Sequence, residues 1–259
     1  MKIYDEKIYE IIAILNTHFS KKDDDYASVD LPNTIKYKSN KWLIYIFYSC
    51  LLNYGMKSKI YHKNLISTYN KYPEIFNYKV VIDKFSNNQE LLFDIIKNNI
   101  HPRYPNVAVK KWMELSIELS KYDNLLNEVK QLNSFSELAA YIKSIKGFGQ
   151  KTGGLLLRLI YEANICDFDD DLPSIPLDRH DIEISYLNNI VESKNLTPKQ
   201  IDLLSDSYIN NGKKLGIKAN VIDKYLWEIG NQYCNKKDCI NCPLFINCKT
   251  KINVVIGNE

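Results

Sequence analysis

Four cysteines lie within fifteen residues near the C-terminus, in the run CNKKDCINCPLFINC with spacing C-x4-C-x2-C-x5-C. They are Cys234, Cys239, Cys242 and Cys248. A cubane iron–sulfur cluster is held by four cysteine thiolates, whereas zinc sites commonly use two ligand pairs separated by a longer loop. The compact run therefore predicts one [4Fe-4S] cluster, with a zinc site as the alternative. Disulfide bonds are the weakest alternative, because we expect no signal peptide and no small secreted framework.

The composition limits the class of protein. The chain has 259 residues, of which 45% are hydrophobic and 25% charged, so it is long and apolar enough to bury a core. Its net charge is only +3, so binding to nucleic acid requires a local basic patch. The longest apolar run, 42–52, is too short to span a bilayer and predicts a buried helix. We expect a cytoplasmic protein that does not enter a membrane.

Helical patterns dominate the chain. The first helix is predicted from an apolar stripe at i, i+3, i+4 and i+7, formed by Ile8, Ile11, Ile12 and Leu15. Thr197 opens a second pattern with a capping box and proline at the first helical position. Asn220 is predicted to cap a helix that ends at Gly230, just before the cysteines. Alternating strand patterns are few and short, so the fold is predicted to be all-α.

A tight turn between two helical patterns lies near the middle of the chain. A capping box at Ser134 opens the first helix, and the second begins directly after the run Lys146, Gly147, Phe148 and Gly149. Glycines permit positive φ and close approach to the backbone, and the new helix presents unpaired N–H groups that suit a phosphate. The surrounding lysines, which are Lys143, Lys146 and Lys151, form a local basic patch. On the turn alone, a plain helical corner remains the simpler interpretation.

Three motifs in order resemble one known family. The hairpin run KGFGQKT is followed by IPLDRH at 175–180 and then by LWEIG at 226–230 before the cysteines. This order resembles the helix-hairpin-helix (HhH-GPD) DNA glycosylases, in particular the iron–sulfur branch with endonuclease III and MutY, over residues 100 to 250. The resemblance implies two helical subdomains. One would span 38–163 with the hairpin at 134–163, and the other 1–37 plus 164–259 with the cluster loop.

The resemblance also implies catalytic residues. Lys151 lies where bifunctional members carry the lysine that attacks the sugar C1′ and forms a Schiff base. Because an amine attacks only when neutral, we expect Lys151 to be buried beside other cations. A surface lysine that contacts phosphate or solvent is the alternative. Asp178 matches the family's essential carboxylate, which stabilises positive charge on the sugar. A plain helix N-cap is the alternative role and is compatible with the first. His180 is expected to be buried and structural.

DNA contacts are implied at three places. The hairpin would bind phosphate through Lys146, Gly147, Phe148, Gly149 and Thr152. Tyr104 is the candidate wedge that fills the gap left by a flipped base, with Arg103 on phosphate or the estranged base. Core packing is an equal alternative for Tyr104. The cysteine loop would touch phosphates through its basic residues, which are Lys236, Lys237, Lys249 and Lys251.

The predicted function is that of a monomeric DNA N-glycosylase and abasic-site lyase of base excision repair. Its partner would be double-stranded DNA with an oxidised pyrimidine, 8-oxoguanine or an abasic site. The alternatives are an abasic-site lyase or mismatch glycosylase of the same fold, and a non-catalytic iron–sulfur DNA-binding module. Three departures from the family matter. The family's glutamine-bearing loop, which helps to read the base, is not recognisable in this sequence. The first cysteine gap is shorter, and an acidic loop at 167–171 lengthens the path from Lys151 to Asp178. We expect this loop to point away from DNA or to shape the pocket rim.

Overall fold

The computed structural model describes residues 2–20, 30–53 and 58–250. The chain forms two compact units, one made of Ala27–Asp170 and the other of Met1–Tyr26 with Asp171–Glu259. Across the described residues the regular structure is helical, and the only β pairing is a single bridge from Ile3 to Val191. The all-α prediction is confirmed. Within the same residues, no helix has both the length and the apolar character needed to cross a membrane.

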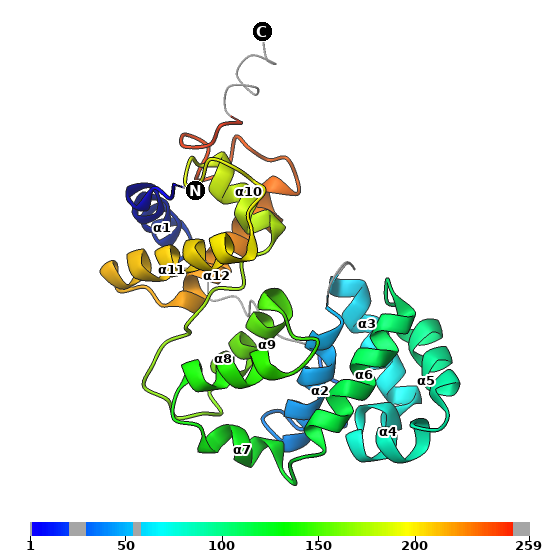
Figure 1. Cartoon of the computed structure of the whole chain (residues 1–259). Coiled ribbons are helices and arrows are strands. Elements are labelled where there is room, and N and C mark those ends of the chain that lie inside the picture. The colour runs from blue at the N-terminus through cyan, green and yellow to red at the C-terminus, as the bar shows by residue number, and fades with distance from the viewer. Residues whose placement is uncertain (1, 21–29, 54–57, 251–259) are drawn as a thin grey trace. The chain divides into compact units, whose positions relative to one another are not determined.

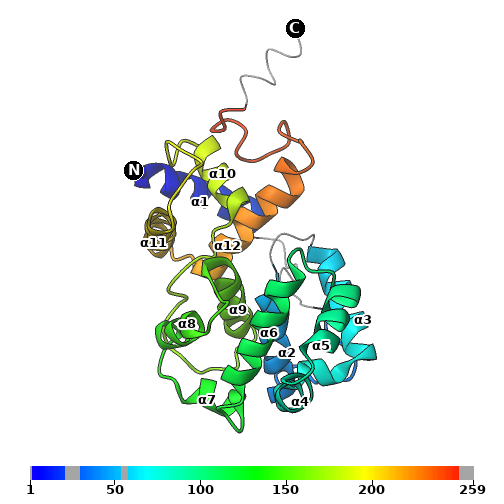
Figure 2. The ribbon, with the colours of Figure 1, turned by 45° about the vertical axis from the view of Figure 1, so that its right-hand side comes forward.

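The unit Ala27–Asp170 packs its helices around one buried helix. Its elements are α2 (Asn40–Leu51), α3 (Ser58–Lys71), η1 (Pro73–Phe76), α4 (Tyr78–Phe85), α5 (Gln89–Ile95), the π-helical turn η2 (Ile96–Ile100), α6 (Pro105–Leu119), α7 (Leu125–Gln131), α8 (Phe135–Ser144) and α9 (Gln150–Glu162). Helix α2 is buried along most of its length and contacts α6, α7 and α9. Both ribbon views show α2 beside α6 (Figures 1 and 2). The predicted buried helix at 42–52 is therefore confirmed.

Aromatic side chains fill the core between α2 and α6. The rings of Tyr48 and Trp112 stack with centroids 4.5 Å apart, and Phe76 meets Trp112 edge-on at 5.3 Å. Their polar tips are satisfied, because Trp112 Nε1 donates to the Ile75 carbonyl at 2.7 Å and Tyr48 Oη lies 2.6 Å from Ser116 Oγ. Buried aromatic groups with paired polar atoms give a well-defined core. This core holds α6, which carries residues that support the hairpin.

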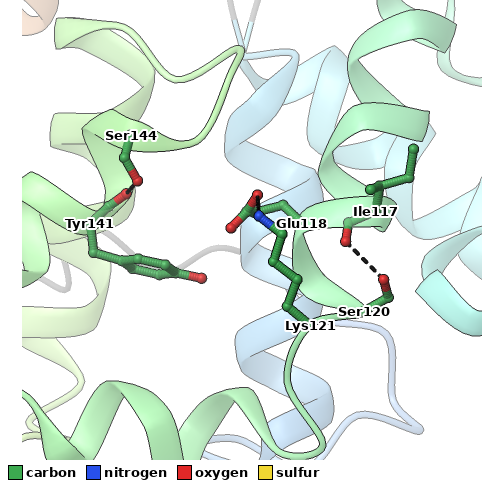
Figure 3. Close-up of polar contacts among 6 residues, drawn as sticks. All are labelled: Ile117, Glu118, Ser120, Lys121, Tyr141 and Ser144. Atoms are coloured by element: carbon green, nitrogen blue, oxygen red, sulfur yellow. Dashed lines mark hydrogen bonds and ion pairs between the residues drawn. The ribbon is translucent and has the colours of Figure 1, made fainter.

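The first hairpin helix, α8, directs an aromatic side chain toward the end of α6. Figure 3 shows Tyr141 pointing toward Glu118, which pairs with Lys121 at 2.6 Å. The Tyr141 ring also meets Tyr122 edge-on at 5.9 Å. Burial, and after it the neighbouring Tyr122 phenol, raise the pKa of Tyr141. The phenol is therefore a neutral packing group that fixes α8 within its unit.

The second unit is built from terminal segments of the chain. Its elements are α1 (Asp5–Phe19), α10 (Arg179–Leu187), α11 (Pro198–Lys214), α12 (Ala219–Glu228) and the π-helical turn η3 (Ile229–Cys234). Helix α1 packs along α11 (Figure 1), and the whole predicted stripe of α1 is buried. The capping box at Thr197 is confirmed, because its hydroxyl accepts the Gln200 N–H while Gln200 Oε1 accepts the Thr197 N–H.

The predicted bounds of the last helix are wrong at both ends. Helix α12 begins at Ala219 with Lys218 at the N-cap, not after Asn220. A carboxylate distant in sequence provides the cap, because Asp171 Oδ2 accepts the Ala219 N–H at 3.0 Å. At the other end the chain continues from Glu228 through η3 to Cys234. The first cysteine, Cys234, therefore lies at the end of a continuous helical segment made of α12 and η3.

Candidate active site and cysteine cluster

The turn between α8 and α9 uses its two glycines differently. Gly147 has φ +107°, and a Cβ built on it would lie 3.0 Å from Leu51 Cδ1. A side chain there is excluded both by backbone conformation and by packing against α2. Gly149 has an ordinary φ of −98°, and a Cβ on it would have nothing within 4 Å. A side chain at position 147 is therefore strained, whereas Gly149 leaves open space above the backbone.

The N-terminus of α9 is not covered by a capping side chain. Gly149 is the N-cap and has no side chain to accept the first-turn N–H groups. Its own N–H donates to Thr152 Oγ1 at 3.1 Å, and Thr152 is buried. This bond fixes the angle at which the turn enters the helix. An uncovered helix N-terminus with an open glycine beside it suits an anion such as phosphate.

The hairpin side chains differ in what they contact. Lys146 is 71% exposed and pairs with Glu114 of α6, with Nζ 2.6 Å from Oε1. Phe148 is buried and meets Phe47 of α2 edge-on at 5.8 Å. The Phe148 side chain is thus an internal anchor, and only its backbone lies at the turn surface. Lys151 is exposed in the first turn of α9, so the expected burial of this lysine is wrong.

Asp178 is the N-cap of α10, as the alternative interpretation predicted. Its Oδ1 accepts the His180 N–H at 2.7 Å, and the residue is half-buried. The helix N-terminus favours the ionised carboxylate. His180 is exposed rather than buried, so the expected buried structural role is wrong. Asp178 therefore combines a capping role with partial access to solvent.

Sequence reasoning missed a second carboxyl next to Asp178. Asp181 Oδ2 accepts the Asp178 N–H at 2.7 Å, and Asp181 is only 7% exposed. Asp223 of α12 is also buried. Burial, followed by the charges of Asp178 and Asp223, raises the pKa of Asp181 well above its usual range. The Asp178-x-x-Asp181 spacing is that of a capping box, which is the signal that could have revealed it.

The candidate wedge lies just before α6. His101 adopts a left-handed conformation with φ +58°, and Tyr104 is the N-cap of α6. The Tyr104 side chain is 52% exposed, and the Arg103 guanidinium lies 5.3 Å from the centre of its ring. The alternative core role of Tyr104 is therefore wrong. Its role as a wedge stays a prediction.

All four predicted cluster cysteines line one cavity of about 310 Å³. Partial burial of its sulfur, and after it the other three thiols, raise the pKa of Cys234 to about 12. The cavity wall also includes Ile184 and Leu187 of α10. Among the described residues, all six cysteines are free thiols. In the same part of the chain, no group of three or more His, Cys, Asp or Glu side chains is close enough to hold a single metal ion.

Successive turns bring the cysteines together. The Cys242 N–H donates to the Cys239 carbonyl at 3.2 Å, and the Cys248 N–H donates to Phe245 at 3.3 Å. The loop is tied to its own unit because the Lys249 N–H donates to the Leu187 carbonyl at 2.8 Å. Lys236 and Lys237 are exposed, as expected for phosphate contacts, and Lys251 lies outside the described residues.

Two carboxylates of the acidic loop at 167–171 serve as helix caps. Asp170 accepts the Phe135 N–H at 2.8 Å and the Ser136 N–H at 3.3 Å, so it caps α8. Asp171 caps α12 within the other unit. Carboxylates at helix N-termini complement the helix dipole. The loop therefore has a structural role that its charge alone did not predict.

Solved structures of similar fold exist, although no protein-family model matches the chain and no curated protein matches it in sequence. The 8-oxoguanine DNA glycosylase of Methanocaldococcus jannaschii is 18% identical with a TM-score of 0.55, over 88% of this chain and 94% of that one. The 8-oxoguanine DNA glycosylase of Thermotoga maritima is 14% identical with a TM-score of 0.57, over 89% and 99%. This chain has the helix-hairpin-helix glycosylase fold.

A third similar structure is the M. jannaschii 8-oxoguanine glycosylase/lyase in complex with DNA containing 8-oxoguanine, at 16% identity and a TM-score of 0.55. It covers 88% of this chain and 97% of that one. Within the glycosylase fold, the relatives named here are 8-oxoguanine enzymes. The finer resemblance to the endonuclease III and MutY branch stays a prediction.

Proposed function

We propose that the chain is a DNA N-glycosylase with abasic-site lyase activity that acts on double-stranded DNA with an oxidised base. The observation that carries the proposal is the hairpin. Lys151 is exposed in the first turn of a helix whose N-terminus is uncovered, beside a glycine with open space above it. The hairpin can hold the backbone of a nucleotide while the lysine reaches its sugar.

The chemistry assigned to Lys151 is covalent. Its neutral amine attacks C1′ of the nucleotide, the C1′–N bond breaks, and the base leaves with the electron pair and takes up a proton. The sugar ring opens to give an iminium between Nζ and C1′. Loss of a C2′ proton then breaks the C3′–O bond, and the strand is cut 3′ to the abasic site. Because Lys151 is exposed, bound DNA must cover it to exclude water from the attacking amine.

Asp178 supplies negative charge to the same reaction. An anionic carboxylate stabilises the positive charge that develops on the sugar as the base departs. The cap geometry supports this role, because hydrogen bonding to His180 fixes one oxygen.

The proposed lesion is 8-oxoguanine. This choice is supported by the similar structures, which are described as 8-oxoguanine glycosylases. An oxidised pyrimidine such as thymine glycol is the alternative. A flipped purine and a flipped pyrimidine differ in size and in the edge they present. An activity assay on both duplexes can therefore decide which of the two lesions the protein removes.

The experiment that tests the function is borohydride trapping on labelled duplexes with an abasic site, 8-oxoguanine or thymine glycol. We expect a covalent band on the abasic and 8-oxoguanine duplexes. A band on the abasic duplex alone would replace the proposal with an abasic-site lyase. Salt-sensitive DNA binding without any band would replace it with a non-catalytic binding module.

We further propose that the four cysteines hold a [4Fe-4S] cluster. Four thiols lining one cavity fit the ligand set of such a cluster. The cluster would be a structural staple for the loop that carries Lys236 and Lys237. We expect the purified protein to be brown and to contain iron and labile sulfide in equal amounts. Cys239→Ser should lose most of the iron, whereas Cys166→Ser, outside the cluster, should retain it. Stoichiometric zinc would contradict the assignment.

A matched pair of glycine variants tests the hairpin. Gly147→Ala should lower the free energy of unfolding by about 1 kcal/mol or more, because alanine must adopt the positive backbone φ of this position. Gly149→Ala should leave the thermal midpoint unchanged, since nothing lies within 4 Å of its Cβ. It should nevertheless weaken binding to an abasic duplex, because the methyl group occupies the space of the phosphate. Equal DNA affinity of Gly149→Ala and wild type would contradict the phosphate role.

A further inference from the structure

We propose that Asp181 is a positioning residue for Asp178. Its buried carboxyl accepts the Asp178 N–H and so holds the backbone of Asp178 in one orientation. The inference rests on the proposed function, because it assigns a support to the carboxylate of that reaction. Three observations carry it, which are the hydrogen bonds at Asp178, the burial of the neighbouring carboxyls and the contrast with a second capping box.

The hydrogen bonds hold Asp178 at both its backbone and its side chain. Its N–H donates to Asp181 Oδ2 at 2.7 Å, and its Oδ1 accepts the His180 N–H at 2.7 Å. Asp181 is itself fixed in α10, because Ser185 Oγ donates to the Asp181 carbonyl at 2.7 Å. With both ends of Asp178 held, little side-chain entropy is lost when the carboxylate meets a cationic sugar.

Burial differs between Asp178 and its neighbouring carboxyls. Asp181 is 7% exposed and Asp223 of α12 is 5% exposed, whereas Asp178 is half-buried at a helix N-terminus. Burial, and after it the nearby Asp178 and Asp223 carboxylates, raise the pKa of Asp181, whereas the hydrogen bond from the Asp178 N–H lowers it. Like charges in a dry site cannot all remain ionised. Burial and the neighbouring carboxyls therefore favour the neutral form of Asp181, which then adds no second negative charge beside Asp178.

The surroundings contain another group that titrates. From α11, Tyr208 Oη lies 2.9 Å from Ser185 Oγ, and burial raises the pKa of this phenol. Tyr208 is therefore neutral at physiological pH and adds no charge to the cluster. Its hydrogen bond to Ser185 completes the set of groups that orient the start of α10.

The box at Thr197 provides a control within the same unit. Gln200 Oε1 accepts the Thr197 N–H at 2.9 Å, which is the same reciprocal arrangement. That box is exposed and no residue of it has a proposed chemical role. Removing its side chain should therefore cost cap stability alone. If variants of Asp181 slow the reaction more than the Gln200 variant does, the additional loss of rate is due to the changed position of Asp178.

The test compares Asp181→Ala, Asp181→Asn and Gln200→Ala. The readouts are the single-turnover trapping rate on an abasic duplex, the Kd for that duplex and the thermal midpoint. We expect Asp181→Ala to slow trapping by about 10- to 100-fold, as loss of an orienting partner does, with Kd changed less than about twofold. Asp181→Asn should trap within about threefold of wild type, because the amide accepts the same N–H and is neutral like the protonated acid. Gln200→Ala should trap at the wild-type rate.

The outcomes separate this inference from the proposed function. No covalent band with the wild-type protein would overturn the proposed function and this inference with it. A wild-type band with Asp181→Ala trapping at full rate would overturn the inference alone. Asp181→Asn as slow as Asp181→Ala would overturn the neutral form of Asp181. Should the Ala variant fail to fold, infrared difference spectra of wild type and Asp181→Asn decide. The wild type must show a protonated carboxylic acid at neutral pH that the variant lacks.

Discussion

Lys151→Ala is expected to abolish the borohydride-trapped band on every duplex, because no other amine would form the Schiff base. The replacement should not disturb the fold. Lys151 is exposed in the first turn of α9, and alanine has the highest helix propensity. Base release should also become undetectable, since the attack that expels the base is made by the same nitrogen. The measurement is single-turnover trapping and strand cleavage on labelled abasic and 8-oxoguanine duplexes.

A matched lysine controls for the lost charge. Lys130 in the last turn of α7 is exposed and lies outside the proposed machinery. Lys130→Ala should trap at the wild-type rate, and both variants should unfold at nearly the wild-type midpoint. The DNA affinity of Lys151→Ala should fall only by the contribution that a single phosphate or sugar contact makes to binding. A full covalent band in Lys151→Ala would transfer the nucleophile to another amine and remove Lys151 from the mechanism.

Local patterns predicted the elements of the fold well. The stripe in α1, the buried run of α2 and the capping box at Thr197 all depend on residues within one or two turns. The hairpin was predictable for the same reason, because Gly147 marks a positive φ that few other residues adopt. Periodicity and capping chemistry are local, so a single sequence contains them.

The contacts that sequence reasoning missed are between segments distant along the chain. Asp171 caps α12 from 48 positions away, and for this reason the start of that helix was misplaced. The DNA contacts of the hairpin stay a prediction, but the packing of the Phe148 side chain on Phe47 is not visible in the local pattern. The same holds for the ion pair between Lys146 and Glu114 of α6. Whether a side chain faces inward or finds an ionic partner is decided by tertiary packing, which no local pattern specifies.

Asp181 illustrates a different limit. Its spacing from Asp178 is visible in the sequence, but a capping box predicts a partly exposed acid with an ordinary pKa. The structure buries this carboxyl beside Asp223 of α12. Asp223, more than forty residues further along the chain, thus helps to raise the pKa of Asp181. The protonation of the acids at the candidate site therefore cannot be predicted without the three-dimensional structure, even where the residues themselves can be.

Asp178→Asn is expected to slow base release by about 100-fold or more while preserving the fold, which separates the two roles of this side chain. Asparagine is as good an N-cap as aspartate, so the His180 N–H keeps its partner and α10 begins at the same residue. What is lost is the negative charge, and removal of one electrostatic stabiliser typically costs 10²- to 10³-fold in rate. The measurement is single-turnover base release from an 8-oxoguanine duplex, followed at saturating enzyme.

The DNA affinity of this variant discriminates between chemistry and misfolding. Loss of a negative charge near DNA should leave affinity unchanged or slightly stronger, because one source of repulsion from phosphates is removed. A misfolded variant would bind more weakly. Asp171→Asn makes the same charge change at another helix cap in the same unit, and should release base at the wild-type rate. If Asp178→Asn also reacted at that rate, Asp178 would be a cap alone, and Lys151 would act without an anionic partner at this position.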